Sequence, residues 1–125
     1  MLKTIMVSAA AFVLCIGAAS AGDFPPDARG DLNCAVVGLE LSAAPTANTQ
    51  VQQAGLMIAV YYLGRLHGRL PGIDLESPIT DAANALTPER FDTERLRCAA
   101  EIQGVGQDLQ AMGARIQARE DQRNP

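Results

Sequence analysis

The first half of the chain begins with a stretch, residues 31–42, that is apolar on almost every side. Between residues 32 and 41 only Asn33 and Glu40 are polar, and Asp31 can cap the amino end of a helix. A helix that is apolar all round is buried in the interior of a protein. We therefore expect residues 31–42 to form a largely buried helix.

A second helix is expected from residue 48 or 49 to about His67. No charged residue occurs between residues 54 and 63, although ten such residues are far too few to span a membrane. Gly68 and the following Pro71-Gly72 are typical of a helix end. Because apolar residues lie on both of its sides, this segment is predicted to be the central helix of the fold.

Two start signals, each a hydroxyl residue followed by proline, open the remaining helices. Ser77 before Pro78 predicts a short helix over about residues 78–86, and Thr87 before Pro88 predicts a long one to about residue 119. Apolar residues three, four or seven apart form one stripe on the long segment: Phe91, Cys98, Ile102, Val105, Leu109, Met112 and Ile116. Interruption of this helix at Gly104 and Gly106 is left open. Residues 120–125 are expected to form a disordered tail.

The amino-terminal residues have the pattern of an export signal. Lys3 supplies a positive charge, residues 5–18 are apolar, and residues 19–21 (Ala-Ser-Ala) form a small-residue cleavage site. We expect a signal peptide over residues 1–21, and a periplasmic or secreted protein with no stable membrane insertion after cleavage. A lipoprotein signal is the rival interpretation, but a leucine precedes Cys15 where such signals need a small residue.

Cleavage after residue 21 leaves two cysteines, Cys34 and Cys98. In an oxidising compartment a single pair predicts one disulfide, which closes a loop of about 65 residues and contributes roughly 4 kcal/mol. A redox-active dithiol is the alternative, but such pairs usually have the spacing Cys-x-x-Cys. The predicted fold is all-α: a flexible leader at residues 22–30, then one small four-helix domain at residues 31–119, stapled by one disulfide.

Charge and composition argue against several kinds of function. The 125-residue chain has 14 acidic against 10 basic residues, so it lacks the basic surface that binds nucleic acid. One histidine beside a cysteine pair gives no ligand set for a metal ion, and no glycine motif for phosphate is present. The two serines beyond the signal, Ser42 and Ser77, lie outside any nucleophile motif. We expect no enzymatic activity, no metal and no cofactor.

Arg65, His67 and Arg69 form the only local cluster of basic side chains. They could contact an anion or a carboxylate of a partner, although such residues more often complement the negative end of a helix. Tyr61 and Tyr62 precede them in an apolar context. A place in the core is the expectation for these tyrosines, and a ligand-facing position is the alternative.

Four features together resemble a group of small exported alphaproteobacterial proteins with no assigned activity. These features are Asp31 to Cys34 at the first helix, Pro45 after it, Tyr61-Tyr62-Leu63-Gly64-Arg65 at the end of the second, and Cys98 in the last. More distantly, they resemble the HdeA-type periplasmic acid-stress chaperones, which are small, all-helical and held by one disulfide between helices. The resemblance spans about residues 31–112, and the chain differs from those chaperones in lacking tryptophan.

The resemblance implies a chaperone that binds unfolded periplasmic client proteins in acid. A physical basis exists, because protonation of the acidic side chains gives the chain a high positive charge, and self-repulsion then loosens a compact state. The alternative is a non-catalytic module or subunit that docks a periplasmic partner through an apolar helix face. The stripe of the last helix would equally serve a homo-oligomer. A patch exposed in the folded state favours the module, and exposure only in acid favours the chaperone.

Overall fold

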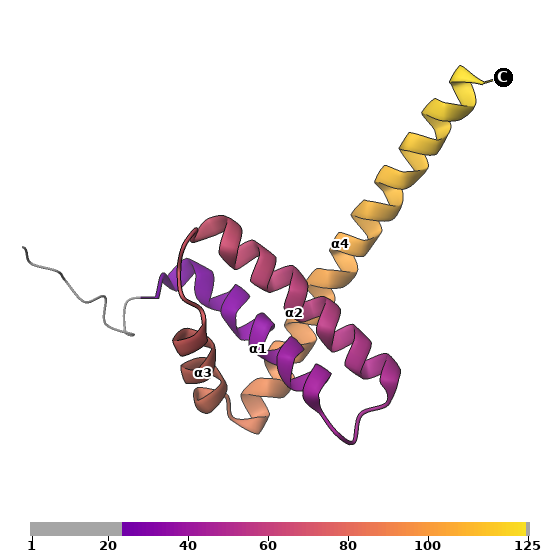
Figure 1. Ribbon diagram of the computed structural model, residues 1–125. Helices are drawn as coiled ribbons and strands as arrows, with labels where there is room; N and C mark the ends of the chain where they lie inside the picture. The colour runs from indigo at the N-terminus through magenta and orange to yellow at the C-terminus, as the bar shows by residue number, and fades with distance from the viewer. Residues whose placement is uncertain (1–23, 125) are drawn as a thin grey trace, which may run out of the picture.

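The structure, a computed structural model, describes residues 24–124 as helices joined by short loops, with no strand among them (Figure 1). A 3-10 helix, η1 (Pro26–Ala28), leads into α1 (Arg29–Ala43), and α2 (Thr49–Arg69), α3 (Glu76–Ala85) and α4 (Pro88–Arg123) follow. The predicted all-α architecture with four helices is confirmed. The predicted signal peptide and its cleavage site lie outside the described residues. None of the described helices is long and apolar enough to cross a membrane.

Side-chain caps fix where two of the helices begin. The Asn48 side chain accepts a hydrogen bond from the Val51 amide at 3.0 Å, and Thr87 does the same for Arg90 at 3.4 Å. The predicted start at Thr87 is therefore confirmed.

The predicted cap of α3 is wrong, because the helix begins before Ser77. The Asp74 side chain accepts a hydrogen bond from the Glu76 amide at 3.0 Å. Ser77 and Pro78 consequently lie inside the first turn, where amides have no partner within the helix and proline is tolerated.

The central helix is α1, and the prediction that α2 would be central is wrong. α1 packs against α2, α3 and α4, and residues 34–38 are all buried. α2 packs chiefly on α1 and meets α4 at one crossing. An apolar side chain is buried only where a neighbouring element covers it, and within the described part of the chain one side of α2 has no such cover.

α1 and α2 cross so closely that their backbones touch. A Cβ atom on Gly38 would lie 2.4 Å from the Ala59 nitrogen, and one on Gly55 would lie 2.6 Å from the Ser42 nitrogen. Any side chain at either glycine would force the two helices apart. This crossing brings the buried residues of α2 onto α1, with Tyr62 and Leu66 fully enclosed.

Both ends of the described chain are more ordered than predicted. Phe24 is buried in the core beside Leu32, so the flexible leader predicted at residues 22–30 is wrong for residues 24–30. α4 continues without interruption through both glycines and ends at Arg123. The disordered tail is therefore wrong for residues 120–123, where a Gln117–Asp121 hydrogen bond and a Glu120–Arg123 ion pair support the last turn.

Candidate interaction surface

One face of α2 carries three large apolar side chains that no other element of residues 24–124 covers. Leu56, Met57 and Val60 are 55%, 71% and 62% exposed. Their spacing of three and four residues places them side by side on the helix. We call these three residues the outer α2 patch. A contiguous apolar group of this kind, unlike single exposed residues, is typical of an interaction site.

The surroundings of the outer α2 patch are uncharged. No residue of α2 from Thr49 to Gly64 carries a charge. A Cβ atom on Gly64, one helical turn beyond Val60, would meet no atom of the described chain within 4 Å. The patch therefore ends beside a bare stretch of helix backbone, where a partner can approach closely.

The opposite side of α2 carries an ionic cluster that joins three helices. The buried Asp31 carboxylate of α1 forms two ion pairs, with Arg65 at 3.2 Å and with Arg69 at 3.0 Å. Arg65 also pairs with Glu101 of α4, and Arg69 pairs with Asp27 at 2.9 Å. Because a buried charge is costly unless it is paired, this cluster fixes α2 in position on α1.

The aromatic pair of α2 packs around the same arginine. The rings of Tyr61 and Tyr62 meet edge to face, and the Arg65 guanidinium lies 5.6 Å from both ring centres. Tyr62 is fully buried, as predicted for a core residue. Burial, reinforced by the neighbouring Glu101 carboxylate, raises the pKa of the Tyr62 hydroxyl above its ordinary value.

Glu101 remains ionised to lower pH than an ordinary glutamate. Partial burial by itself would raise its pKa, but the hydrogen bond from Arg65 and the positive charges of Arg65 and Arg97 outweigh burial. The net result is a lowered pKa. At the contact between α2 and α4, the folded structure therefore favours the ionised form of the Glu101 carboxylate.

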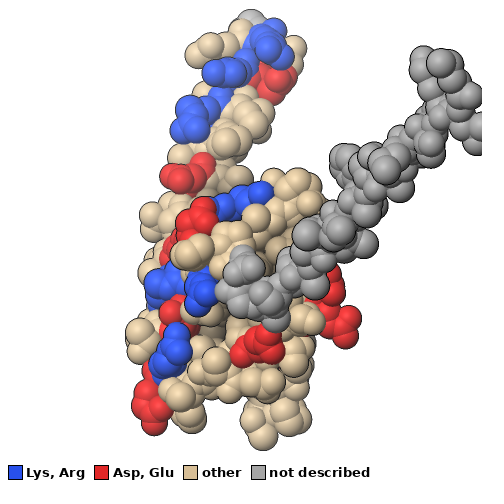
Figure 2. All heavy atoms as spheres, turned by 90° about the vertical axis from the view of Figure 1, so that its left-hand side faces the viewer, with Lys and Arg blue, Asp and Glu red and all other residues tan. Residues whose placement is uncertain are grey.

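Of the three basic residues singled out in the sequence, Arg65 and Arg69 are brought together at the Asp31 carboxylate, and His67 is not. The guanidinium groups of Arg65 and Arg69 face carboxylates of this chain. His67 is exposed, and its Nδ1 lies 2.8 Å from the Leu63 carbonyl oxygen of the same helix. Contact of these residues with an external anion stays a prediction. Figure 2 shows acidic and basic side chains interspersed on the face that it presents.

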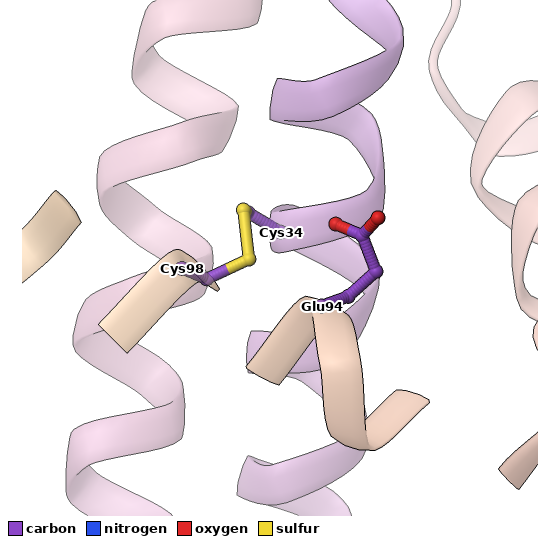
Figure 3. Close-up of side chains that lie close together, drawn as sticks. All are labelled: Cys34, Glu94 and Cys98. Carbon is purple, nitrogen blue, oxygen red and sulfur yellow. A yellow bond between two sulfur atoms is a disulfide. The ribbon is translucent and has the colours of Figure 1, made fainter. Parts of the chain in front are cut away.

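Cys34 of α1 and Cys98 of α4 form the predicted disulfide, with a Cα–Cα distance of 5.6 Å (Figure 3). Both are fully buried. Arg97 donates hydrogen bonds to the Gly30 carbonyl oxygen at 2.9 Å and to Cys34 Sγ at 3.1 Å. α4 is thus attached to α1 by one covalent bond and by a neighbouring arginine.

Glu94 brings a carboxylate close to the two sulfur atoms, all within 4.8 Å of one another. Figure 3 shows the Glu94 side chain beside the disulfide rather than between the sulfurs. A metal ion at cysteine requires thiolate ligands, and a disulfide offers none. The carboxylate instead accepts a hydrogen bond from Arg97 at 2.6 Å. In the oxidised protein, Glu94 and Arg97 therefore lie beside the disulfide that attaches α4 to α1.

A groove of about 270 Å³ lies between α1, α3 and the start of α4. Its lining combines the apolar side chains of Phe24, Leu32 and Leu86 with the arginines Arg29 and Arg90. Sequence reasoning missed this groove, because its lining comes from separate elements and no local motif marks it.

Comparisons of the chain with protein-family models, with curated proteins and with solved structures find no match.

Proposed function

We propose that this protein is an exported, non-catalytic interaction module that docks a folded partner through the outer α2 patch. The observation that carries the proposal is the exposure of Leu56, Met57 and Val60, each more than half open to solvent in the folded chain. The disulfide supports export, because such bonds persist in oxidising compartments.

The chemistry of this face defines the partner. An uncharged strip beside Gly64 suits an apolar ridge, such as the apolar side of an amphipathic helix. Met57 is the most exposed of the three side chains, and methionine adapts its shape to different partner surfaces. Large apolar side chains at the centre of an interface carry much of the binding energy, so truncation or charge at this position is expected to abolish docking.

The test is site-specific photo-crosslinking in periplasm at neutral pH, with a probe at position 56. We expect a discrete crosslinked species that is lost in Met57→Glu and retained in Asn84→Glu, which places the same charge on the exposed face of α3. Equal crosslinking by the two variants, or no species with the unaltered patch, would refute docking at α2. Circular dichroism of both variants confirms that the fold is intact.

The acid-stress chaperone is the second candidate, and the ionic junction at Glu101 favours it. Protonation of Glu101 removes its ion pair with Arg65, whereas the Cys34–Cys98 bond cannot be broken by acid. Acid would therefore loosen α2 from α4 while keeping the helices attached. Light scattering of an acid-labile client at pH 2 to 3, with oxidised and then reduced protein, tests this function. Suppression by the oxidised form supports it, and no suppression by either form excludes it.

A further inference from the structure

The groove between α1, α3 and the start of α4 is lined by two kinds of side chain. Phe24 and Leu32 belong to the buried core, and Leu86 is half-buried at the end of α3. Arg29 and Arg90 are exposed, and they come from the first turns of α1 and α4. We call this hollow the α3 groove and its two arginines the rim arginines. It therefore joins an apolar floor to a cationic rim.

Small side chains on α3 keep the α3 groove open. None of the 10 residues of α3 is fully buried, and the side that faces the groove carries Pro78, Ala82 and Ala85. These side chains are too short to fill the space beside α1. A volume of about 270 Å³ holds about nine water-sized volumes of roughly 30 Å³ each. Because a methylene group occupies about as much space as a water molecule, the groove suits a short hydrocarbon chain.

The rim arginines have no anionic partner within residues 24–124. Neither guanidinium group forms an ion pair or a hydrogen bond in this part of the chain, whereas Arg65, Arg69 and Arg97 all face carboxylates. Asp81 also lines the groove, and it too is unpaired among the described residues. Two positive charges and one negative charge leave the lining with a net charge that complements a single anion.

An amide adds a third polar group to the lining. Asn33 of α1 is half-buried, and its side chain forms no hydrogen bond with the described residues. The Asn33 amide can donate to an oxygen of a ligand, and a guanidinium group can hold both oxygens of a carboxylate. An apolar lining with a few polar groups that orient the ligand is the usual composition of a small-molecule site.

We propose that the α3 groove binds an aliphatic monocarboxylic acid with a chain of about eight carbon atoms. The chain lies on the apolar floor, and the rim arginines hold the carboxylate. Asp81 disfavours ligands with a second negative charge. None of the residues that line the groove belongs to α2, so this site is independent of the proposed function at the outer α2 patch.

Three probes of equal chain length separate the contributions of the floor and the rim. Octanoate offers both the chain and the anion, octanol offers the chain without charge, and octylamine replaces the anion with a cation. We expect octanoate to bind with a Kd on the order of 1 mM, as suits a ligand of about ten non-hydrogen atoms. Octanol is expected to bind about tenfold more weakly, because it forms no charge-assisted hydrogen bond. Octylamine is expected not to bind.

NMR titration of the isotope-labelled, oxidised mature chain at neutral pH locates the bound probe. Octanoate is expected to shift the backbone amide signals of Asn33, Ala82 and Leu86 in a saturable manner. The signals of Leu56 and Val60 in the outer α2 patch are expected to stay unchanged. Equal shifts at both places would show general adsorption to apolar surfaces and would overturn the proposal, as would the absence of saturable shifts up to about 20 mM.

Charge variants test the role of the rim. Arg29→Gln and Arg90→Gln are each expected to weaken octanoate binding about tenfold. Arg115→Gln removes an exposed arginine that is outside the lining and unpaired within the described chain, so the affinity is expected to stay unchanged. Combining Arg29→Glu with Arg90→Glu is expected to reverse the preference, so that octylamine binds and octanoate does not. Unchanged octanoate affinity in both single glutamine variants would refute recognition of the carboxylate.

A matched pair of larger side chains tests the role of the floor. Ala85→Phe places a ring inside the groove and is expected to abolish octanoate binding. Asn84→Phe places the same ring on the exposed side of α3, outside the lining, and is expected to leave binding intact. Circular dichroism of every variant confirms that the fold is retained. Equal octanoate affinity in the two phenylalanine variants would place the ligand elsewhere and overturn the proposal.

Discussion

The two halves of α4 carry one apolar stripe but have different surroundings. In the first half the stripe reaches the core at Cys98, where the disulfide and Arg97 attach α4 to α1. In residues 105–123, which we call the α4 arm, the same stripe is exposed at Leu109, Met112 and Ile116. The periodicity of apolar residues along a helix shows which side of the helix is apolar. Whether that side is covered depends on the elements that pack against it. The open continuation of a core-facing stripe is therefore recognised only after the neighbouring elements have been placed.

The largest loss of stability is expected from removal of the disulfide. This bond attaches the first half of α4 to α1. Cys34→Ala combined with Cys98→Ala opens a loop with a sequence separation of 64. The free energy of unfolding of the body is expected to fall by about 4 kcal/mol. Urea unfolding followed by tyrosine circular dichroism measures the loss, and a decrease below about 1 kcal/mol would contradict a stabilising role for this bond.

A matched pair of truncations compares the two halves directly. Ile102→Ala removes a side chain packed against the core and is expected to lower the free energy of unfolding by about 2 kcal/mol, at the low end for buried isoleucine. Leu109→Ala removes an exposed side chain and is expected to change the free energy of unfolding by under about 0.5 kcal/mol. Similar losses in urea melts of the two variants would show that the arm folds against the body.

The smallest change in stability is expected at the ion pair between Arg65 and Glu101, which lies between the two halves of α4. Because the pKa of Glu101 is lowered by folding, its contribution to stability is present above its unfolded pKa of about 4.3 and disappears as the pH falls through the lower folded value. Glu101→Gln is expected to cost under about 1 kcal/mol at neutral pH, since both partners are about one-third exposed.

Urea melts between pH 7 and pH 3 measure this contribution. The difference between Glu101→Gln and the unaltered chain is expected to shrink below pH 4. A difference that stays constant over this range would show that the charge of Glu101 is irrelevant to stability.

Much of the fold follows from local signals. The start at Thr87, the burial of α1 and Tyr62, and the pairing of Cys34 with Cys98 were predicted from side-chain chemistry and apolar periodicity. Each depends on residues close in sequence or, for the cysteines, on there being a single pair. Such features require no knowledge of how the helices are arranged.

The predictions that are wrong concern features that depend on how the helices are arranged in space. Both α1 and α2 carry apolar residues on more than one side, and composition alone does not say that the closely packed crossing at Gly38 and Gly55 leaves the far side of α2 open. The ion pairs of Asp31 with Arg65 and Arg69 join residues more than thirty positions apart in sequence. The basic cluster was assigned either to an external anion or to the negative end of its helix, and neither interpretation names the carboxylates of the same chain that Arg65 and Arg69 meet.

The position of the disulfide has a mechanical consequence. The α4 arm acts as a lever about 28 Å long, and the Cys34–Cys98 bond lies near the point where this lever meets the body. A force that a bound molecule applies to the arm is transmitted to α1 through the covalent bond. Contacts of Glu101 and Ile102 lie between the arm and this bond. If a force opens these contacts, the disulfide still holds α4 to the most deeply buried helix.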